Sequence, residues 1–168
     1  MDKTRHTLSV QVKDEDGIIS RVTAMFTRRG FSIVSLVSAK TESKGIARLT
    51  IVVDADEYSI EQITKQLNKI IPVLKVVRLD EERSIARSLM LVKVNASNAN
   101  RPQVVDAAKL FRARVIDVAP ESVIIEATGT PAKLRALLDV LEPFGIRELQ
   151  RSGVIAMNRG PKSTTPTR

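Results

Sequence analysis

The sequence predicts an α+β fold of two ferredoxin-like domains, each with the element order β-α-β-β-α-β. Segments of alternating polar and apolar residues are interspersed with segments whose apolar residues recur at helical spacing, and this order appears twice within 168 residues. That length allows two small domains, each with a modest core. We place the first domain at residues 5–80, a charged linker at 81–87, the second domain at 88–158, and a disordered tail without apolar residues at 159–168.

The first strand is predicted at residues 7–13, where polar and apolar residues alternate strictly. The apolar residues of this strand are expected to face the core: Leu8, Val10 and Val12. The intervening residues are expected on an open, wettable face of the sheet: Thr7, Ser9 and Gln11.

Helical spacing and turn signals predict the rest of the first domain. Apolar residues at i, i+4, i+7 and i+8 predict a helix over Ile18–Arg29, which Gly30 ends in a left-handed conformation. Ser59 is expected to cap a second helix, with Gln62 completing a capping box. The remaining predicted strands are residues 33–40 and 46–54, which form a hairpin, and residues 73–79.

The second half of the chain repeats this order. Its predicted strands are residues 88–95, 115–119 and 122–128, with a last strand inside 146–157, and its helices begin at Pro102 and Pro131. Because few residue identities are shared between the halves, the repeat indicates a shared architecture only.

Composition excludes several classes of protein. Without any Cys, the chain has no disulfide framework, no thiolate metal site and no cysteine nucleophile. No apolar run approaches the roughly 18 residues that span a bilayer, and the polar N-terminal residues lack the apolar stretch of a signal peptide. We therefore expect a cytoplasmic protein.

The net charge of +8 raises an alternative function, a basic ferredoxin-like module that binds nucleic acid. Residues 85–168 carry 13 basic against 7 acidic residues, and the predicted topology is also that of the RNA-recognition motif. That motif stacks bases on aromatic rings of its central strands, whereas residues 46–54 and 122–128 contain no aromatic residue. A solvated surface with a basic tail also explains the charge, since the positive residues alternate with acids.

Candidate catalytic groups are few. The single histidine, His6, has no neighbour in sequence to orient it and is expected to be a solvated surface residue. Asp14, Glu15 and Asp16 are consecutive, so they cannot converge on one metal ion without the long loop of a calcium site, and we interpret them as an acidic turn. No phosphate loop, dinucleotide fingerprint or nucleophile elbow occurs. We therefore expect no catalysis, no metal and no cofactor in this chain.

The strongest candidate binding site is the corner from Asp14 to Ser20. Because a helix begins directly after Gly17, the N–H groups of its first turn are free to hold an anion. An amino-acid ligand would place its α-carboxylate there, its ammonium group against Asp14, and a small aliphatic side chain against Ile18 or Ile33. A capped turn without any ligand is equally consistent with these residues.

The chain also resembles a known family. The motifs that carry the resemblance in the first half are Thr7-Leu8-Ser9-Val10, Asp16-Gly17-Ile18-Ile19-Ser20-Arg21-Val22, Phe26-Thr27-Arg28-Arg29-Gly30-Phe31-Ser32-Ile33 and Glu61-Gln62-Ile63-Thr64-Lys65. Those in the second half are Leu91-Val92-Lys93-Val94, Ile116-Asp117-Val118, Gly129-Thr130 and Arg151-Ser152-Gly153. They are similar to motifs of the acetolactate synthase (acetohydroxyacid synthase) small subunits, whose first domain is an ACT domain and whose second is ACT-like.

The resemblance implies a non-catalytic regulatory subunit of valine, leucine and isoleucine biosynthesis. Such a subunit activates a large catalytic subunit, in which thiamine diphosphate, Mg²⁺ and FAD are expected. It also confers feedback inhibition by branched-chain amino acids, valine first. ACT domains of this family pair as homodimers with effector sites at the interface, and no nucleic-acid or membrane partner is implied.

The resemblance further implies effector-binding residues. From the helix start of one chain these are Asp14, Gly17, Ile18 and Ser20, and from the partner chain they are Ser32, Ile33 and Ala39. Two positions depart from the family pattern, because Asp16 stands where many members have Pro and Ser32 where many have Asn. A serine hydroxyl reaches less far and offers fewer donors than an amide, so we expect effector affinity or preference to differ.

Overall fold

The computed structural model describes residues 3–164, which form two compact units. One unit comprises the described residues up to Ala86 together with those from Val154 onward, and the other is Arg87–Gly153. The first unit contains β1 (Thr4–Lys13), α1 (Ile18–Arg28), β2 (Ile33–Lys40), β3 (Ile46–Ala55), α2 (Glu57–Asn68), β4 (Val73–Leu79) and β9 (Ile155–Asn158). The strand β5 (Ser84–Asn95) begins in this unit and continues into the second, which contains α3 (Arg101–Leu110), β6 (Arg114–Val118), β7 (Ser122–Gly129), α4 (Pro131–Leu141), the 3₁₀ turn η1 (Glu142–Phe144) and β8 (Ile146–Arg151).

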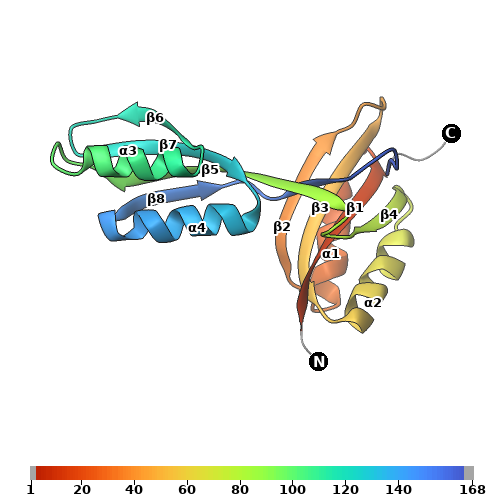
Figure 1. Ribbon diagram of the computed structural model, residues 1–168. Helices are drawn as coiled ribbons and strands as arrows, with labels where there is room; N and C mark the ends of the chain where they lie inside the picture. Colours follow the sequence, from red (N-terminus) through yellow and green to blue (C-terminus); the bar gives the residue numbers. More distant parts are fainter. Residues whose placement is uncertain (1–2, 165–168) are drawn as a thin grey trace. The chain divides into compact units, whose positions relative to one another are not determined.

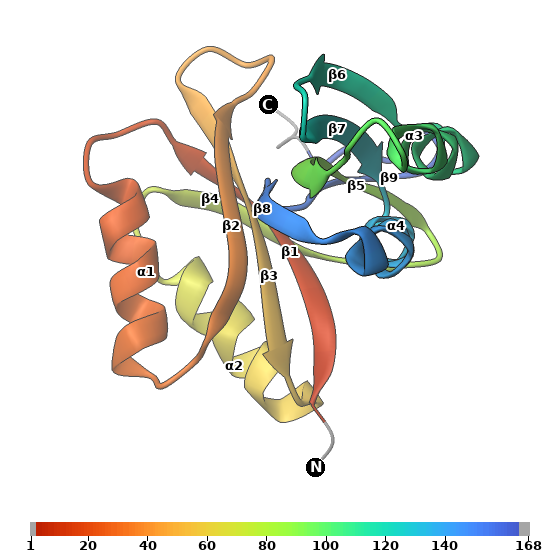
Figure 2. The same cartoon turned by 90° about the vertical axis from the view of Figure 1, so that its left-hand side faces the viewer.

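The first unit has an antiparallel sheet in the order β2-β3-β1-β4, with α1 and α2 on one face (Figures 1 and 2). β1 is central, and its residues Leu8, Val10 and Val12 have no exposed surface, as predicted. They share a core with the apolar stripes of both helices, whose buried members are Ile18, Val22, Met25, Phe26, Ile60, Ile63 and Leu67. The apolar residues that alternate along β1 and those that recur at helical spacing on α1 therefore pack in the same core.

The second unit repeats this arrangement around β5. Its sheet has the order β6-β7-β5-β8, and α3 and α4 pack on one face (Figure 1). The strand β9 of the first unit also pairs with β5, which begins in that unit. Its buried residues include Met90, Val92 and Val94 of β5 and Leu134, Leu137 and Leu141 of α4. The predicted α+β class with repeated β-α-β-β-α-β order is confirmed. Across residues 3–164, none of the helices has the length and apolar character that a bilayer crossing requires.

The outer face of the first sheet is not open. Ser9 and Gln11 are each only 1% exposed, so their predicted place on a wettable face is wrong. The Gln11 Nε2 atom donates a hydrogen bond to Thr164 Oγ1 at 3.5 Å, which places the end of the described chain over this face. Alternation along one strand identifies which face meets the core, but it carries no information about a distant segment that covers the other face.

The second helix is capped by Asp56, three residues before Ser59. The Asp56 Oδ1 atom accepts the N–H of Ser59 at 2.7 Å, and α2 begins at Glu57. Ser59 therefore lies inside the first turn, and the predicted capping box of Ser59 with Gln62 is wrong. Asp and Ser are comparable N-caps, so residue type alone did not separate the two positions.

The element and unit boundaries also differ from the predicted domain plan. The predicted linker, 81–87, includes the start of β5, and the predicted last-strand region contains two strands, β8 and β9. β9 belongs to the first unit, although the second domain was placed at 88–158. In the predicted tail, Arg159 donates its N–H to Arg83 O at 2.8 Å, while residues 165–168 lie outside the described residues.

The second core yields a direct stability test. Leu137 is fully buried on α4, whereas Leu110 at the end of α3 is 81% exposed. Leu137→Ala is expected to lower the free energy of unfolding by about 2–5 kcal/mol, because it leaves a cavity. Leu110→Ala, the matched control, is expected to change it by less than about 0.5 kcal/mol. Urea unfolding measures both, and equal effects of the two variants would contradict the packing described.

Candidate functional site

The corner between β1 and α1 is held by backbone hydrogen bonds at the end of β1. Lys13 donates its N–H to Pro72 O at 2.8 Å, and Asp14 donates its N–H to Gly45 O at 2.9 Å. The loop is therefore fixed between the turn that precedes β4 and the hairpin that joins β2 to β3. Sequence analysis did not identify Pro72 or Gly45, because no residue pattern marks a main-chain carbonyl as an acceptor.

Gly17 turns the chain from this loop into α1. It is the N-cap residue, with φ of 78° and ψ of 5°, a left-handed conformation that residues with a Cβ rarely adopt. Apart from its chain neighbours, no heavy atom lies within 4 Å of the position that a Cβ would occupy. The backbone at the start of the helix therefore faces open space, and a ligand can approach it closely.

The first turn of α1 keeps unpaired N–H groups. Ile18 donates its N–H to Glu15 O at 3.3 Å, so the prediction that this group is free is wrong. The first bond along the helix runs from Arg21 N–H to Gly17 O at 3.0 Å, and no side chain caps the helix. Within residues 3–164, the N–H groups of Ile19 and Ser20 have no acceptor. Two donors at the positive end of a helix dipole are suited to a carboxylate.

The predicted effector residues of the first group lie together at this corner. Asp14, Gly17 and Ser20 are exposed there, while the Ile18 side chain is only 5% exposed and belongs to the core. Because its N–H is also bonded to Glu15 O, Ile18 can offer a ligand only the exposed edge of its side chain.

The second group of predicted residues is divided between the two ends of β2. Ser32 and Ile33 lie at its start, where Ile33 pairs with Val53, whereas Ala39 lies near its end, opposite Arg48. Six residue-to-residue steps separate Ile33 from Ala39, which corresponds to about 20 Å of extended strand. Ala39 is thus at the same end of the sheet as Gly17, and Ser32 and Ile33 are at the other end of the same chain.

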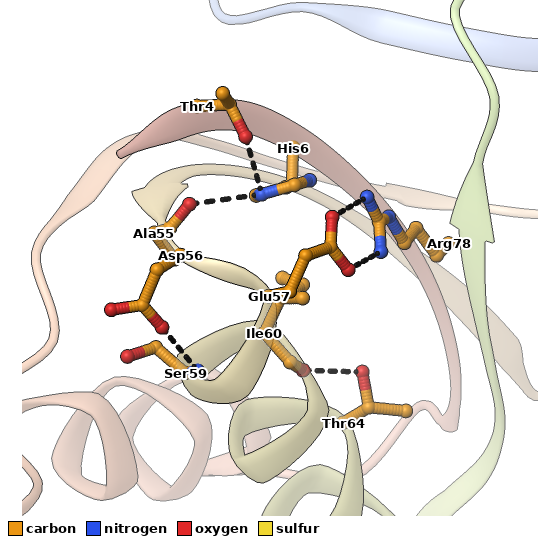
Figure 3. A network of polar contacts seen from close by, with 9 residues as sticks. All are labelled: Thr4, His6, Ala55, Asp56, Glu57, Ser59, Ile60, Thr64 and Arg78. Atoms are coloured by element: carbon orange, nitrogen blue, oxygen red, sulfur yellow. Dashed lines mark hydrogen bonds and ion pairs between the residues drawn. The ribbon is translucent and has the colours of Figure 1, made fainter. Parts of the chain in front are cut away.

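A second polar cluster lies at the opposite end of this sheet (Figure 3). His6 is only 5% exposed, so its prediction as a solvated surface residue is wrong. Its Nε2 atom lies 3.0 Å from both Ala55 O and Thr4 Oγ1. Because a carbonyl oxygen only accepts, Nε2 carries a proton and donates to Ala55. The groups that orient the His6 ring are the Ala55 carbonyl on β3 and the hydroxyl of Thr4. Neither is a carboxylate or another group typical of a catalytic pair, so nothing in the sequence indicates that His6 is held in place.

Two ion pairs border His6. Arg78 binds both carboxylate oxygens of Glu57, each at 2.7 Å, and this holds the pKa of the Glu57 carboxyl below its ordinary value (Figure 3). Arg5 binds Asp54 in the same way at 2.9 and 3.0 Å and lowers the pKa of Asp54. A cavity of about 430 Å³ at this end is lined by residues 4–6 and 78–81. Since the guanidinium groups of Arg5 and Arg78 are each already paired with a carboxylate, we interpret the cluster as a set of contacts that stabilises this end of the sheet.

The strands offer no platform for stacking bases. None of the strands within residues 3–164 contains Phe, Tyr or Trp. Phe26 is buried in the first core, Phe111 and Phe144 pack against the second, and Tyr58 is on α2. In the part of the chain described, no three His, Asp or Glu side chains gather closely enough to hold a metal ion.

Comparison with known proteins gives matches along nearly the whole chain. Residues 8–75 match the AHAS small subunit-like ACT domain, and residues 87–160 match the family described as the small subunit of acetolactate synthase. The chain is 55% identical to the acetolactate synthase small subunit of Mycobacterium bovis over 162 residues, 96% of each chain. It is 54% identical to that of Mycolicibacterium smegmatis over 157 residues, which cover 94% of this chain and 92% of the relative. The solved small subunit from Thermotoga maritima is similar in structure, with a TM-score of 0.87 and 35% identity over 95% of this chain and 99% of that one.

The ion pair of Glu57 with Arg78 predicts a pH dependence of stability. Because the folded-state pKa of Glu57 is lowered, the pair stabilises the fold above the ordinary glutamate pKa, and this contribution is lost as the pH falls through the folded-state value. Glu57→Gln is expected to lower the thermal midpoint at neutral pH and to reduce its fall between about pH 5 and pH 3. The effect is expected to be small, since the two side chains are 44% and 70% exposed.

The matched control for this prediction is Glu61→Gln, which changes an exposed glutamate on the same helix outside the ion pair. Thermal unfolding followed by circular dichroism measures all three proteins. An unchanged pH dependence in Glu57→Gln would contradict the assigned role of the pair.

Proposed function

The chain belongs to the acetolactate synthase small-subunit family, and from this we propose that it is the regulatory subunit of an acetolactate synthase, inhibited by branched-chain amino acids, valine first. It activates a catalytic subunit that carries thiamine diphosphate, Mg²⁺ and FAD, and performs no chemistry itself. Both act in the cytoplasm in branched-chain amino-acid biosynthesis. The observation that carries the proposal is the open, left-handed corner at Gly17, with unpaired N–H groups, inside the region matched by the ACT-domain family.

The corner provides the groups that a small zwitterion requires. The α-carboxylate is bound by the N–H groups of Ile19 and Ser20, where the helix dipole also favours a negative charge. The ammonium group lies against the exposed carboxylate of Asp14. The open space beside Gly17 accepts the ligand without displacing any side chain.

A second copy of the chain completes this site. β2 is an edge strand, so its outer row of backbone groups is available to pair with another β2. Antiparallel pairing about a two-fold axis brings the start of one β2 to the end of the other. Ser32 and Ile33 of the second copy then lie near the Gly17 corner, which they cannot reach within one chain. Ala39 is contributed by the same chain as Gly17.

Inhibition of the catalytic subunit by valine follows from the position of the ligand at the interface between the two copies. Valine stabilises the dimer arrangement to which it binds more tightly, by an amount equal to its differential affinity. If the catalytic subunit is activated by another arrangement, binding of valine and activation oppose each other, and by linkage the catalytic subunit weakens valine binding equally.

The proposal is tested by calorimetric titration of the folded chain with valine, together with acetolactate formation by the catalytic subunit in its presence. We expect saturable binding, activation without valine, and loss of that activation as valine is added. A folded chain that binds no valine at millimolar concentration and leaves the catalytic subunit unchanged would overturn the proposal.

Gly17→Asp is expected to abolish valine inhibition while activation persists. The new carboxylate projects into the open space where the ligand carboxylate lies, and its charge repels that group. The left-handed backbone adds a strain of about 1 kcal/mol, which the control must share.

The matched control is Gly160→Asp, because Gly160 has φ of 72° and equally open space beside it. It introduces the same strain and charge outside the proposed site, so its valine inhibition is expected to equal that of the unaltered chain. Persistent inhibition in Gly17→Asp, measured in the coupled enzyme assay, would place the effector site elsewhere.

A further inference from the structure

The outer face of the first sheet, the side away from α1 and α2, gathers polar groups that have no partner. Within residues 3–164, five buried side-chain nitrogen or oxygen atoms make no hydrogen bond. Four of the five lie on this face: Ser9 Oγ, Gln11 Oε1, Ser35 Oγ and Arg48 Nε. Because most buried polar groups in folded proteins are hydrogen-bonded, four unpaired ones on a single face indicate that a bound ion or ligand is their partner.

Strand pairing places three of these side chains next to a lysine. Arg48 of β3 and Lys75 of β4 lie directly opposite Gln11, one on each side of it, and Ser9 is the next residue of β1 on the same face. Residues that pair directly across strands have their side chains on the same face, with Cβ atoms about 5 Å apart. Gln11 and Ser9 are each 1% exposed, and Arg48 and Lys75 are partly buried. These four residues form the Gln11 cluster.

The two basic side chains of the Gln11 cluster are not neutralised by the part of the chain that is described. Neither Arg48 nor Lys75 belongs to any ion pair there. The only carboxylate on this face of the four strands is Asp54, which is bound to an arginine at the opposite end of the sheet. The segment from Val154 to Thr164, which ends over the cluster, contributes two basic residues and no acidic residue. Cations that are partly withdrawn from water without a counter-charge are unfavourable, so the cluster is suited to an anion.

Every member of the Gln11 cluster can donate a hydrogen bond. Ser9 offers its O–H, Arg48 its Nε–H and Lys75 its ammonium group. Because the Thr164 O–H can donate as well as accept, the Gln11 amide can also lie with Oε1 toward Thr164 and Nε2 toward the cluster. A water molecule accepts only two hydrogen bonds, whereas the oxygens of an oxyanion accept from all four donors.

We propose that the Gln11 cluster binds a doubly charged oxyanion of the phosphate or sulfate type, beneath the end of the described chain. Arg48 and Lys75 balance its two charges, while Ser9 and Gln11 donate neutral hydrogen bonds that fix its position. This site lies on the face of the sheet, whereas the Gly17 corner lies at the end of the sheet, and its ligand is not the proposed effector. Because the strands that carry the site come together only on folding, the anion stabilises the folded chain.

Binding is measured by calorimetric titration of the full chain with inorganic phosphate, at an ionic strength held constant with chloride. We expect saturable binding of phosphate and of sulfate, and about tenfold weaker binding of acetate, which carries a single charge. Arg48→Gln and Lys75→Gln are each expected to weaken phosphate binding about tenfold or more, since each removes a charge-assisted hydrogen bond. Arg28→Gln, which removes an exposed charge from the last turn of α1, is the matched control and is expected to bind phosphate as the unaltered chain does.

Ser9→Ala separates a ligand site from a defect of packing. In chloride alone, this variant is expected to have an unchanged or higher thermal midpoint, because it removes a buried hydroxyl that has no partner. Its affinity for phosphate is expected to fall, because the hydroxyl is then a lost ligand contact. Circular dichroism shows whether each variant is folded. A folded chain that binds no phosphate at millimolar concentration would refute the site, as would a folded Arg48→Gln variant with undiminished affinity or acetate binding as tight as that of phosphate.

Discussion

Two backbone hydrogen bonds at the end of β1 determine where the candidate binding corner of the first unit lies. The bonds from Lys13 to Pro72 and from Asp14 to Gly45 fix the end of the central strand between two turns. Because β1 is paired on both sides, this end cannot move without disturbing the sheet. The left-handed Gly17 can therefore present the start of α1 at a defined position, which a ligand site requires.

The strand registers show which predicted effector residues lie together within one chain and which do not. Pairing places Ile33 opposite Val53, which also pairs with His6, so the start of β2 is at the His6 end of the sheet. The Gly17 corner is at the other end. The proposed pairing of a second chain antiparallel along β2 would combine both ends in one site, and a ligand there would report on the association of two chains rather than on the fold of one.

Much of the fold could be predicted from the sequence because local patterns were unambiguous. The alternation of Leu8, Val10 and Val12 and the helical stripe ending at Phe26 each identify one face, and both faces are buried as predicted. The predictions for His6 and Gln11 failed because their partners, a carbonyl on β3 and the distant Thr164, are tertiary contacts that leave no local signal. The prediction for Ser59 failed because Asp56, three residues earlier, is an equally suitable cap.

The candidate site was only partly predictable for the same reason. The sequence from Asp14 to Ser20 predicts that a helix begins after Gly17, and α1 does begin there. The sequence does not indicate that the Ile18 N–H donates to Glu15 O and is therefore not free. The connection of this corner to the turn before β4 passes through the carbonyl of Pro72, so residue types alone do not reveal it. It emerges only from the backbone geometry.

The most direct test of the account is a titration of the isotope-labelled chain with valine, followed by the amide resonances of the backbone. The account predicts that the largest shifts occur at the N–H groups of Ile19 and Ser20, with a second set at Ser32 and Ile33. Shifts confined to the second unit, or no shift at millimolar valine in a folded chain, would contradict it.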